Sequence, residues 1–534
     1  MGLYLNPGGE KFRTSIRSEI YVDKSELIAF TNKRIRTEQK YLCVSRPRRF
    51  GKSMALGMLA AYYGCEETTD DLFSGLKICQ DPSYTLHLNQ YDTITVNMQT
   101  FLSRSEDMDS MLALLETRLI KELRMKYPLA DADAQHLDWA MGEIFAKTRK
   151  PFIILIDEWD CVFREYTHDT LSQKKYLDFL RLWLKDQDYV GLAYMTGILP
   201  VKKYGSHSAL NMFTEYSMVN PKQLAPYFGF TEDEVQLLCA KYHMDFEGVK
   251  AWYDGYHFQL PDDFENGHPH PKILSVYSPK SVIEAMLCRK YDSYWNQTET
   301  YEALKIYIQM NYDGLKDSVI KMLAGGSVKV NVGTFSNDME TFTSQDDILT
   351  LLIHLGYATY SESAQTVEIP NKEVSGEYVN AIKVIGWKGV LDSVEASYQL
   401  LHSLWELDSD AVAKGLDRAH QEVSILQYND ENALSYTIGL AFYTAREYYT
   451  IVRELPAGKG YADISMIPYG PSLDKPAVII ELKWGKSPDE ALAQIKNRHY
   501  SDALMAYRDN LLLVGINYDR NTKKHECRIE RLTD

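Results

Sequence analysis

Cysteine is sparse in this sequence, and the cysteines are not spaced like the ligands of a metal site. The seven cysteines are scattered along 534 residues and include no C-x-x-C pair. Zinc ribbons and disulfide frameworks need regularly spaced cysteines, so neither is expected, and a reducing cytoplasm is the predicted location. The first ten residues contain no apolar signal core, and no later stretch is apolar enough to cross a bilayer. The sequence therefore predicts no membrane partner.

Positive charge is also in short supply. Lysine and arginine number 58 against 74 aspartates and glutamates, which gives a net charge of -16. The molecule as a whole repels nucleic acid and anionic membranes, so any polyanion must bind to local basic surface. The apolar share of 45% and charged share of 25% are ordinary for a globular protein. Because 534 residues are more than one hydrophobic core usually organises, two or three domains are expected.

Internal repeats and low-complexity segments are absent, and the first half instead alternates short apolar strands with helices. Such strands, apolar throughout and flanked by helices, are typical of a mainly parallel sheet covered on both faces. The strands are expected to begin at Tyr41 and to lie at Thr93–Val96, Phe152–Ile156 and Gly191–Met195. The predicted fold class is therefore α/β.

The second half begins after a segment rich in Pro, Asp, Gly and His at Pro261–Pro271, which predicts a turn-rich connector. A mostly helical region follows. In it, a helix over Asp346–Tyr360 and a hairpin strand over Thr366–Pro370 suit a winged-helix-like module. From about Glu431 the pattern predicts a separate small α/β domain. Its expected elements are a helix, two apolar strands, a helix over Asp489–Tyr500 and a final strand over Leu511–Ile516.

The segment from Tyr41 to Ser53 has the order of a phosphate-binding loop: strand, polar loop, helix start. A phosphate is bound by inward-pointing backbone N–H groups and by the positive end of the following helix. Gly51 permits close approach of the backbone, Lys52 can reach the β- and γ-phosphates, and Ser53 offers a hydroxyl to Mg²⁺. Arg46 occupies the position where the general pattern has its first glycine.

A second acidic element completes the predicted nucleotide site. Asp157 and Glu158 follow a buried strand, and parallel strands end at the ligand-binding edge of such a sheet. Asp157 is predicted to hold Mg²⁺ and Glu158 to polarise the attacking water. Thr196, at the end of the next strand, is placed to sense the γ-phosphate. The alternative is an ordinary helix start and a solvated strand end, which is unconvincing when both elements occur together.

These blocks resemble the bacterial AAA-ATPase-like family of P-loop proteins. The similarity covers about Leu3 to Trp295 and includes the loop Arg46–Ser53, in a family whose loop commonly lacks its first glycine. It also includes the blocks Leu155–Asp160, Thr196–Pro200, Phe228–Val235 and Trp252–Tyr256. The resemblance implies an ATPase of the additional-strand type. The residues expected to bind ATP are Arg48, Arg49, Phe50, Gly51, Lys52, Ser53, Met54, Asp157 and Thr196, with Ser53 and Asp157 at the Mg²⁺.

A second group of charged residues lies near the C-terminus, at Asp463, Glu481 and Lys483. Alternation along a strand puts Glu481 and Lys483 on one face, and a hairpin would bring Asp463 next to Glu481. Two adjacent carboxylates resist joint ionisation unless a cation such as Mg²⁺ offsets their charge. Lys483 would then orient or activate a water for attack on phosphorus. The alternative is a surface hairpin with an ordinary Glu–Lys pair.

This layout resembles the PD-(D/E)XK nuclease superfamily, in particular the nuclease-like domain that accompanies this ATPase family. The matching features run from about Gln421 to Ile529 and include the approach from Gly458 to Asp463 and Gln494 on the next helix. The resemblance implies a restriction-endonuclease-like fold with catalytic Asp463, Glu481 and Lys483. The predicted domains are 1–295, ATPase-like; 296–420, helical and winged-helix-like; and 421–534, nuclease-like.

Two functions follow from these predictions. The first is an ATP-binding and ATP-hydrolysing protein coupled to an Mg²⁺-dependent nuclease, in defence or DNA processing, with DNA favoured over RNA. The second is a nucleotide-driven switch or scaffold whose nuclease-like domain binds nucleic acid or a protein without cleaving. The sequence favours the first modestly because Asp463, Glu481 and Lys483 are all present. It leaves homo-oligomer formation open.

Overall fold

The computed structural model describes residues 2–128, 136–201, 210–260, 263–265, 268–270, 272–295, 300–310, 314–335, 342, 344–422, 431–457, 460–519 and 521–532. The chain forms two compact units, each built from separate segments. Unit 1 comprises Met1–Glu234, Tyr256–Ile283 and Val330–Gln365. Unit 2 comprises Val235–Gly255, Glu284–Lys329 and Thr366–Asp534.

Unit 1 is organised around a five-stranded parallel sheet with the order β2-β3-β4-β1-β5. Strand β4 lies between β1 and β3, which is the additional strand that the family resemblance implied. The first four strands are almost wholly buried; β1, β3 and β4 are mainly apolar, whereas β2 alternates polar residues with Ile94 and Val96. Their bounds are β1 Tyr41–Ser45, β2 Asp92–Asn97, β3 Phe152–Asp157, β4 Val190–Gly197 and β5 Thr214–Tyr216.

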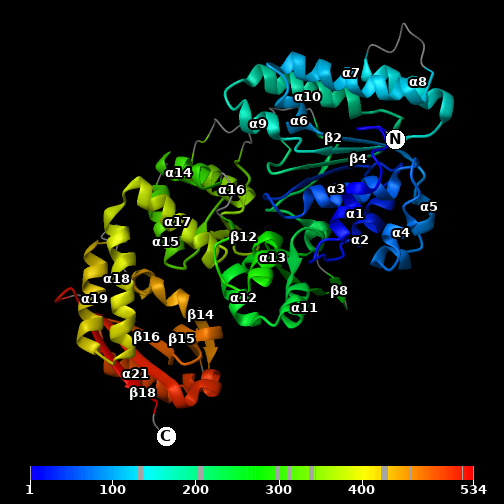
Figure 1. The fold of residues 1–534 in the computed structure, drawn as a ribbon. Helices are drawn as coiled ribbons and strands as arrows, with labels where there is room; N and C mark the ends of the chain where they lie inside the picture. The colour runs from blue at the N-terminus through cyan, green and yellow to red at the C-terminus, as the bar shows by residue number, and fades with distance from the viewer. Residues whose placement is uncertain are drawn as a thin grey trace. The chain divides into compact units, whose positions relative to one another are not determined.

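Helices cover both faces of this sheet (Figure 1). On one face, α3 (Lys52–Tyr63) packs with α1 (Glu10–Ile16) and α2 (Glu26–Asn32) over side chains of β3 and β4 such as Leu155 and Tyr194. The other face carries α7, α8 and α10. The remaining helices of residues 1–230 are α4 Asp70–Phe73, η1 Lys77–Gln80, α5 Tyr84–His87, α6 Met98–Leu102, α7 Met108–Lys126, α8 Leu137–Thr148, α9 Cys161–Glu165, α10 Thr170–Leu184 and η2 Lys222–Tyr227.

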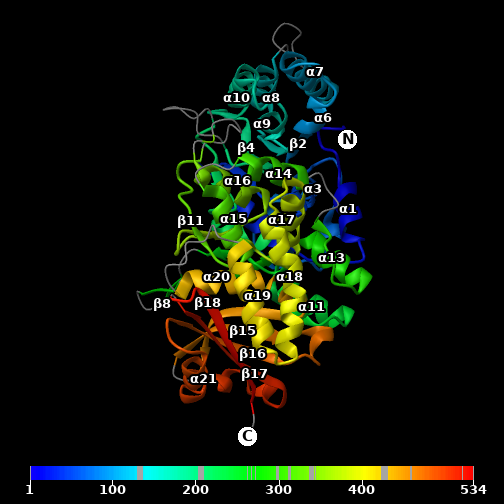
Figure 2. The same cartoon turned by 90° about the vertical axis from the view of Figure 1, so that its left-hand side faces the viewer.

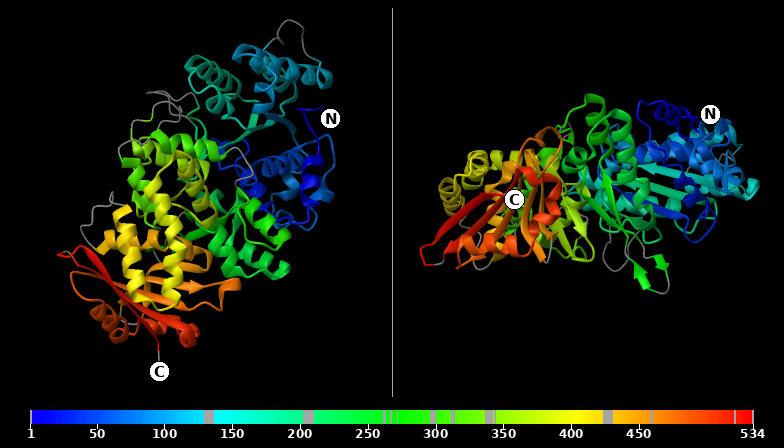
Figure 3. Two further views of the ribbon diagram at one scale, coloured as in Figure 1. Left: turned by 60° about the vertical axis from the view of Figure 1, so that its left-hand side comes forward. Right: turned by 90° about the horizontal axis from the view of Figure 1, so that it is seen from below.

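The segment that composition predicted to be a turn-rich connector carries strands. Where it is described, it forms a short antiparallel pair, β8 (Asp263–Glu265) with β9 (His268–His270), seen in green in the right-hand view of Figure 3. On either side of this pair, β7 (Tyr256–Gln259) and β10 (Ile273–Tyr277) join β6 (Phe230–Thr231) in an antiparallel sheet. Helix α13 (Pro279–Cys288) follows.

The helix predicted over Asp346–Tyr360 is shorter in the structure. Helix α16 spans Gln345–Leu355 and ends because Gly356 takes a left-handed conformation with φ of 87°. Strand β12 (Thr359–Ser361) follows it, and the strand predicted over Thr366–Pro370 is β13 (Thr366–Glu368), which pairs antiparallel with β11 (Val328–Lys329).

Unit 2 contains a mixed five-stranded sheet with the order β14-β15-β16-β17-β18, most of which is visible in orange and red in Figure 2. Only β16 and β17 are parallel. The strand expected to be last, at Leu511–Ile516, is longer and is followed by another. The bounds are β14 Tyr449–Ala457, β15 Gly460–Pro468, β16 Ala477–Trp484, β17 Leu511–Asp519 and β18 Lys524–Arg531.

Two apolar cores lie on the two faces of this sheet. On one face, Ile480 and Leu482 pack with residues of α18, α19 and α20. On the other face, Ile479 packs with Ile495 of α21 and with Tyr500. The helices of unit 2 are α11 Glu232–Tyr242 (from Val235 on), α12 Phe246–Tyr253, α14 Thr300–Met310, α15 Leu315–Leu323, α17 Lys372–Ile385, α18 Lys388–Trp405, α19 Ser409–Glu422, α20 Glu431–Ala441, η5 Tyr443–Glu447, η6 Gly470–Ser472, α21 Pro488–Asn497 and η7 Tyr500–Asn510.

Candidate functional sites

The phosphate loop connects β1 to the N-terminus of α3. Gly51 is the residue before the helix and has φ of 89°, a conformation that side chains disfavour. A Cβ at this position would meet no heavy atom within 4 Å, so backbone conformation and not space accounts for the glycine. The Lys52 ammonium is buried and donates to the carbonyl oxygens of Arg46 and Pro47 at 2.8 and 2.9 Å. These bonds hold the lysine inside the loop, and burial lowers its pKa.

Asp157 lies at the carboxyl end of β3 and connects the loop to the sheet. Its two oxygens accept hydrogen bonds from the Ser53 hydroxyl, at 2.7 Å, and from the Thr196 hydroxyl. The structure therefore brings together one residue from each of three elements: the start of α3, the end of β3 and the end of β4. This is the cluster that the sequence predicted at the sheet edge, and its oxygen atoms are of the kind that Mg²⁺ binds.

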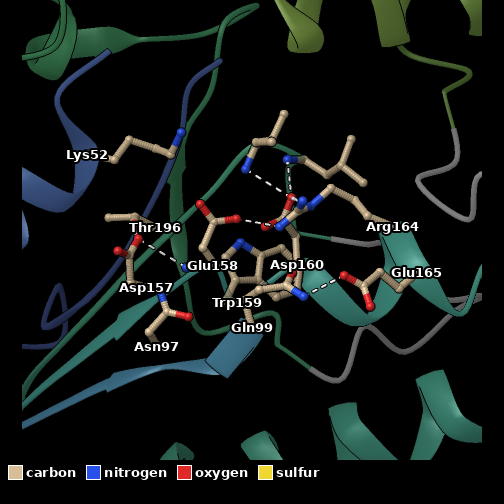
Figure 4. A network of polar contacts seen from close by, with 12 residues as sticks. Lys52, Asn97, Gln99, Asp157, Glu158, Trp159, Asp160, Arg164, Glu165 and Thr196 are labelled. Carbon is tan, nitrogen blue, oxygen red and sulfur yellow. Dashed lines mark hydrogen bonds and ion pairs between the residues drawn. The ribbon is translucent and has the colours of Figure 1, made fainter. Parts of the chain in front are cut away.

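Glu158 is partly buried and is held by an arginine (Figure 4). Its φ is 52°, a left-handed conformation that is rare for a residue other than glycine. Its carboxylate pairs with the guanidinium of Arg164 on α9. Burial raises the pKa of Glu158, and the attraction of Arg164 opposes that rise. A carboxylate with a raised pKa is a better proton acceptor than an ordinary glutamate.

Asp160 and Arg164 are site residues that sequence reasoning missed. Asp160 is fully buried and accepts backbone hydrogen bonds from Ile198 and Leu199 at 3.0 and 2.8 Å. Arg164 Nε lies 3.3 Å from the same carboxylate. Arg164 therefore connects Glu158 to the chain that follows β4. The nearest signal in the sequence is the spacing of Glu158, Asp160 and Arg164, which places all three at a strand-to-helix turn.

Arg46 does not point into the phosphate site. Its side chain is completely buried and donates through Nη1 to the carbonyl oxygens of Ser45 and Tyr216, at 2.8 and 2.9 Å. The guanidinium carbon lies 5.6 and 5.4 Å from the ring centroids of Phe228 and Phe258. Burial lowers the pKa of Arg46 to about 9. The arginine in place of the first glycine thus packs behind the loop.

The other loop residues differ in how they could contact a nucleotide. Arg48 and Arg49 are half-buried, and Arg49 has a buried Nη1 with no hydrogen-bond partner among the described residues. Phe50 is buried and contacts the ring of Tyr256 edge-on, so its side chain packs within the protein. Met54 is 45% exposed. Only Arg48, Arg49 and Met54 among these four can present side chains to a ligand.

An apolar cavity of about 80 Å³ lies beside the phosphate loop. Gly51 and Met54 form one side of it, and Tyr21 and Val22 contribute from the segment before α2. Further lining residues are Phe12, Ser15, Ile20, Lys24, Phe50, Ala55, Met58, Tyr227, Gly229, Phe230, Pro279 and Ile283. The cavity is suited to an apolar, planar group next to a phosphate. Its residues come from distant parts of unit 1, so no local sequence pattern indicates it.

The carboxylates predicted near the C-terminus lie on neighbouring strands of the unit 2 sheet. Ile464 of β15 pairs with Ile480 of β16, so Asp463 and Glu481 are the next residues on their strands. An oxygen of Asp463 accepts the backbone N–H of Leu482 at 2.7 Å. Both features agree with the predicted hairpin. Gly458 and Lys459, in the approach to Asp463, lie outside the described residues.

Glu481 is a buried carboxyl group of this centre with a perturbed pKa. It is 2% exposed, and one oxygen accepts hydrogen bonds from Lys483 Nζ, at 2.8 Å, and from Gln494 of α21. Its other oxygen, Oε2, is buried with no hydrogen-bond partner among the described residues. Burial and the charge of Asp463 raise the pKa of Glu481 to about 7, against the lowering effect of Lys483. A bound cation would therefore favour the state in which both carboxylates are charged.

A third group of potential metal ligands is already neutralised. Cys65, Glu66 and Asp92 lie close enough together to share an ion. The Lys126 ammonium, however, pairs with both carboxylates and lies 3.7 Å from the cysteine sulfur. This cluster is an ion-pair network at the surface of unit 1. No described helix is long and apolar enough to cross a membrane.

Each candidate site lies in a region that matches a known protein family. Residues 8–206 match the model of a predicted AAA-ATPase family, and residues 430–527 match the PD-(D/E)XK nuclease superfamily. The chain joins a predicted AAA-ATPase region to a PD-(D/E)XK nuclease-superfamily region. The phosphate loop, Asp157 and Glu158 lie inside the first match, and Asp463, Glu481 and Lys483 lie inside the second.

Individual proteins similar to this chain share little sequence identity with it. An uncharacterized protein in the vnfD 5′ region of Azotobacter chroococcum mcd 1 is 25% identical over 291 residues. That match covers 52% of this chain, and the chain spans about half, 51%, of the relative. Solved structures similar to this chain include Cdc6p from Pyrobaculum aerophilum, with 9% identity and a TM-score of 0.27, over 70% of this chain and 98% of that one. The ORC2 protein of Aeropyrum pernix has 10% identity and a TM-score of 0.28, over 71% and 98%.

Proposed function

We propose that unit 1 binds and hydrolyses ATP. The base would enter the apolar cavity beside Gly51 and Met54, and the phosphates would lie along the loop at the start of α3. Lys52 would exchange its two carbonyl partners for phosphate oxygens. Ser53 and Asp157 would hold Mg²⁺, which supplies charge neutralisation for the triphosphate. The observation that carries this proposal is the Ser53–Asp157–Thr196 cluster beside the loop.

The chemical step would depend on Glu158 and Thr196. Glu158 would accept a proton from the attacking water once its carboxylate leaves Arg164. The Thr196 hydroxyl, which now donates to Asp157, lies at the end of β4 where it would reach the γ-phosphate or the water. Arg48 and Arg49 would add positive charge near the phosphates. Each role is assigned to a side chain at the same edge of the sheet.

Replacing Lys52 and Glu158 separately tests this proposal. We expect Lys52→Ala to weaken ATP binding at least tenfold, and Glu158→Gln to retain binding but lose at least 100-fold of the turnover rate. Binding is measured with a fluorescent ATP analogue and turnover by phosphate release. Lys77→Ala, an exposed lysine on η1, serves as the control. Turnover that survives in Glu158→Gln would remove Glu158 from the chemical step.

We propose that unit 2 cleaves nucleic acid in a metal-dependent reaction, with DNA favoured over RNA. Asp463 and Glu481 would hold Mg²⁺, which would supply stabilisation of the negative charge that develops on phosphorus. Lys483, whose ammonium lies beside Glu481, would orient the attacking water. The observation that carries the proposal is the buried, unpartnered Oε2 of Glu481 beside a second carboxylate. In this proposal, ATP bound to unit 1 controls cleavage in defence or DNA processing.

Cleavage assays test this second activity. The full chain is incubated with single- and double-stranded DNA and RNA, with Mg²⁺ or Mn²⁺, with and without ATP. We expect Asp463→Ala and Lys483→Ala each to reduce cleavage more than 100-fold, whereas Lys486→Ala, at an exposed position of the same segment, leaves it unchanged. Nucleotide-dependent binding of nucleic acid without any cleavage would instead support a switch or scaffold.

A further inference from the structure

A second cavity, of about 260 Å³, lies within unit 2, and Asp463, Glu481 and Lys483 are not among the residues that line it. It is enclosed by the end of α15, the start of α17, helix α20, and strands β14 and β15. Lys372, Arg446 and Arg453 are its charged lining residues. The others are Ala251, Met322, Ala324, Gly325, Ile369, Pro370, Asn371, Ser375, Ser435, Ile438, Gly439, Phe442, Tyr449, Thr450, Ile451, Ile464 and Met466. No aspartate or glutamate is among the described residues that line it.

The three cations of this cavity lack close acidic partners. Among the described residues, no carboxylate oxygen forms an ion pair with Lys372, Arg446 or Arg453. The charges of Glu447, Glu454 and Asp463 act on Lys372 or Arg453 only at a distance. Nη1 of Arg446 is buried and has no hydrogen-bond partner in the part of the chain that the structure describes. Burial lowers the pKa of Arg446, and the charge of Arg453 lowers it further. The three side chains are half-buried, and partly desolvated cations without a close carboxylate favour the approach of an anion.

Aromatic rings take the place of carboxylates around these side chains. The Lys372 ammonium lies 3.8 Å from the ring centroid of Trp252, and the Arg453 guanidinium lies 4.5 Å from that of Tyr436. Cation–π contacts hold a cation in position while leaving its net charge uncompensated. Burial lowers the pKa of Lys372 to about 8. The protein therefore positions three positive charges around one space, although the chain as a whole carries a net charge of -16.

The backbone around the cavity is shaped to leave room for these groups. Gly325 has φ of 82°, and a Cβ there would lie 3.0 Å from Nη2 of Arg446. The 14-residue helix α17 begins at the cavity, with Asn371 as its N-cap and Lys372 as its first residue. The positive end of that helix adds to the field of the three side chains. Shape, charge and helix orientation all favour a negatively charged occupant.

We propose that this cavity binds a phosphate-bearing anion through Lys372, Arg446 and Arg453. Arginine favours phosphate because its planar guanidinium can donate two parallel hydrogen bonds, and two arginines with one lysine match a doubly charged phosphate group. The cavity volume suits a phosphate or pyrophosphate group with part of the molecule that carries it. The site is separate from the phosphate loop, and it does not depend on the activity of either proposed centre.

Calorimetric titration of the full chain with inorganic pyrophosphate tests this proposal. The protein carries Lys52→Ala so that the phosphate loop does not contribute, and the buffer contains EDTA so that no metal centre contributes. We expect one binding site, at least tenfold weakened by Arg446→Gln or Arg453→Gln. Lys383→Gln, an exposed position on the same helix α17, removes the same charge and should leave binding unchanged.

Thermal unfolding provides a readout that detects misfolded variants. Pyrophosphate should raise the melting temperature of the Lys52→Ala chain. Arg446→Gln should melt at a higher temperature than its parent without ligand, because it removes a half-buried cation, and pyrophosphate should not raise that temperature further. A 5′-phosphorylated oligonucleotide that binds more tightly than pyrophosphate and its 5′-hydroxyl counterpart would identify a nucleic-acid end as the source of the phosphate. Equal binding of pyrophosphate by the parent and both arginine variants, or no binding at all, would overturn the proposal.

Discussion

At the scale of single residues, the two proposed centres each contain one glutamate whose charge is opposed by burial. Glu158 is offset by Arg164, an arginine from the following helix. Glu481 is offset only in part, by Lys483 and Gln494 on one oxygen. Glu158 can therefore exchange its arginine partner for another group, and Glu481 can accept a further partner on its other oxygen. Different tests follow for each.

Replacing Glu481 is expected to stabilise the metal-free protein at high pH. The pKa of this group is about 7 in the folded protein against an ordinary value of 4.5. The folded state is therefore increasingly penalised as the pH rises from the lower value to the higher, by on the order of 1–3 kcal/mol above pH 7. Glu481→Gln removes this penalty. Its unfolding free energy in EDTA should exceed that of the parent at pH 8, with little difference attributable to this ionisation at pH 4.

Magnesium supplies the internal control for that experiment. Mg²⁺ should raise the melting temperature of the parent at pH 8 and have a smaller effect on Glu481→Gln. If the variant were no more stable than the parent at pH 8 without metal, burial of the charged Glu481 carboxylate would not lower the unfolding free energy of the parent.

Replacing Arg164 is expected to shift the pH dependence of ATP hydrolysis. The positive charge of Arg164 lowers the pKa of Glu158, so its loss raises that pKa. In Arg164→Gln the acid limb of the turnover profile should move to higher pH. Arg181→Gln, at an exposed position on α10, is the matched control. Superimposable profiles for Arg164→Gln and the parent would show that the pair does not govern the proton acceptor.

At the scale of elements, the phosphate loop depends on the turn between η2 and β6. The N–H of Gly229 donates to the carbonyl oxygen of Phe50 at 3.2 Å. Gly229 has φ of 89°, and a Cβ there would lie 2.3 Å from Cγ1 of Val276. The turn therefore supports the loop through this hydrogen bond, at a position where Val276 leaves no room for a Cβ atom. This gives the Phe228–Val235 block a packing role next to the loop.

Gly229→Ala should destabilise unit 1 by about 2–4 kcal/mol and weaken ATP binding, because backbone strain and a steric clash act together. Gly75→Ala is the control: Gly75 also has a positive φ, of 85°, but its Cβ would meet nothing within 4 Å. Gly75→Ala should lower the unfolding free energy by only about 1 kcal/mol. Denaturant unfolding and nucleotide titration measure both effects. Equal losses in the two variants would show that the contact with Val276 is unimportant.

Sequence patterns predicted the features that depend on neighbouring residues. The apolar run before Asp157 predicted a strand ending at the sheet edge, and alternation correctly put Glu481 and Lys483 on one face of β16. Features that join distant segments were not predicted. Arg46 is buried against Phe228 and Phe258, far along the chain, and no local pattern indicates that burial. The same reason explains why both cavities were missed.

At the scale of the whole molecule, unit 1 is completed by a segment far from its other parts. Residues Val330–Gln365 belong to unit 1 and include α16, whose Ile348, Leu352 and Ile353 are fully buried. The Tyr256 hydroxyl donates to the carbonyl oxygen of Gly356 at 2.6 Å. A chain cut at the predicted domain boundary, residue 295, would lack this segment.

A fragment of residues 1–295 is therefore expected to melt at least 5 °C below a fragment of residues 1–365 and to bind ATP more weakly, because its apolar surface is exposed. Differential scanning calorimetry and nucleotide titration compare the two. Fragments of equal stability would show that Val330–Gln365 is dispensable for unit 1.

The interleaved units also have a consequence for how such a protein can evolve. The chain passes between the units after residues 234, 255, 283, 329 and 365. A single recombination event in this part of the chain would leave at least one unit incomplete, so neither can be exchanged as a cassette by one crossover. A crossover after residue 365 would exchange the whole nuclease-superfamily region, which would then have to pack against the earlier unit 2 segments Val235–Gly255 and Glu284–Lys329.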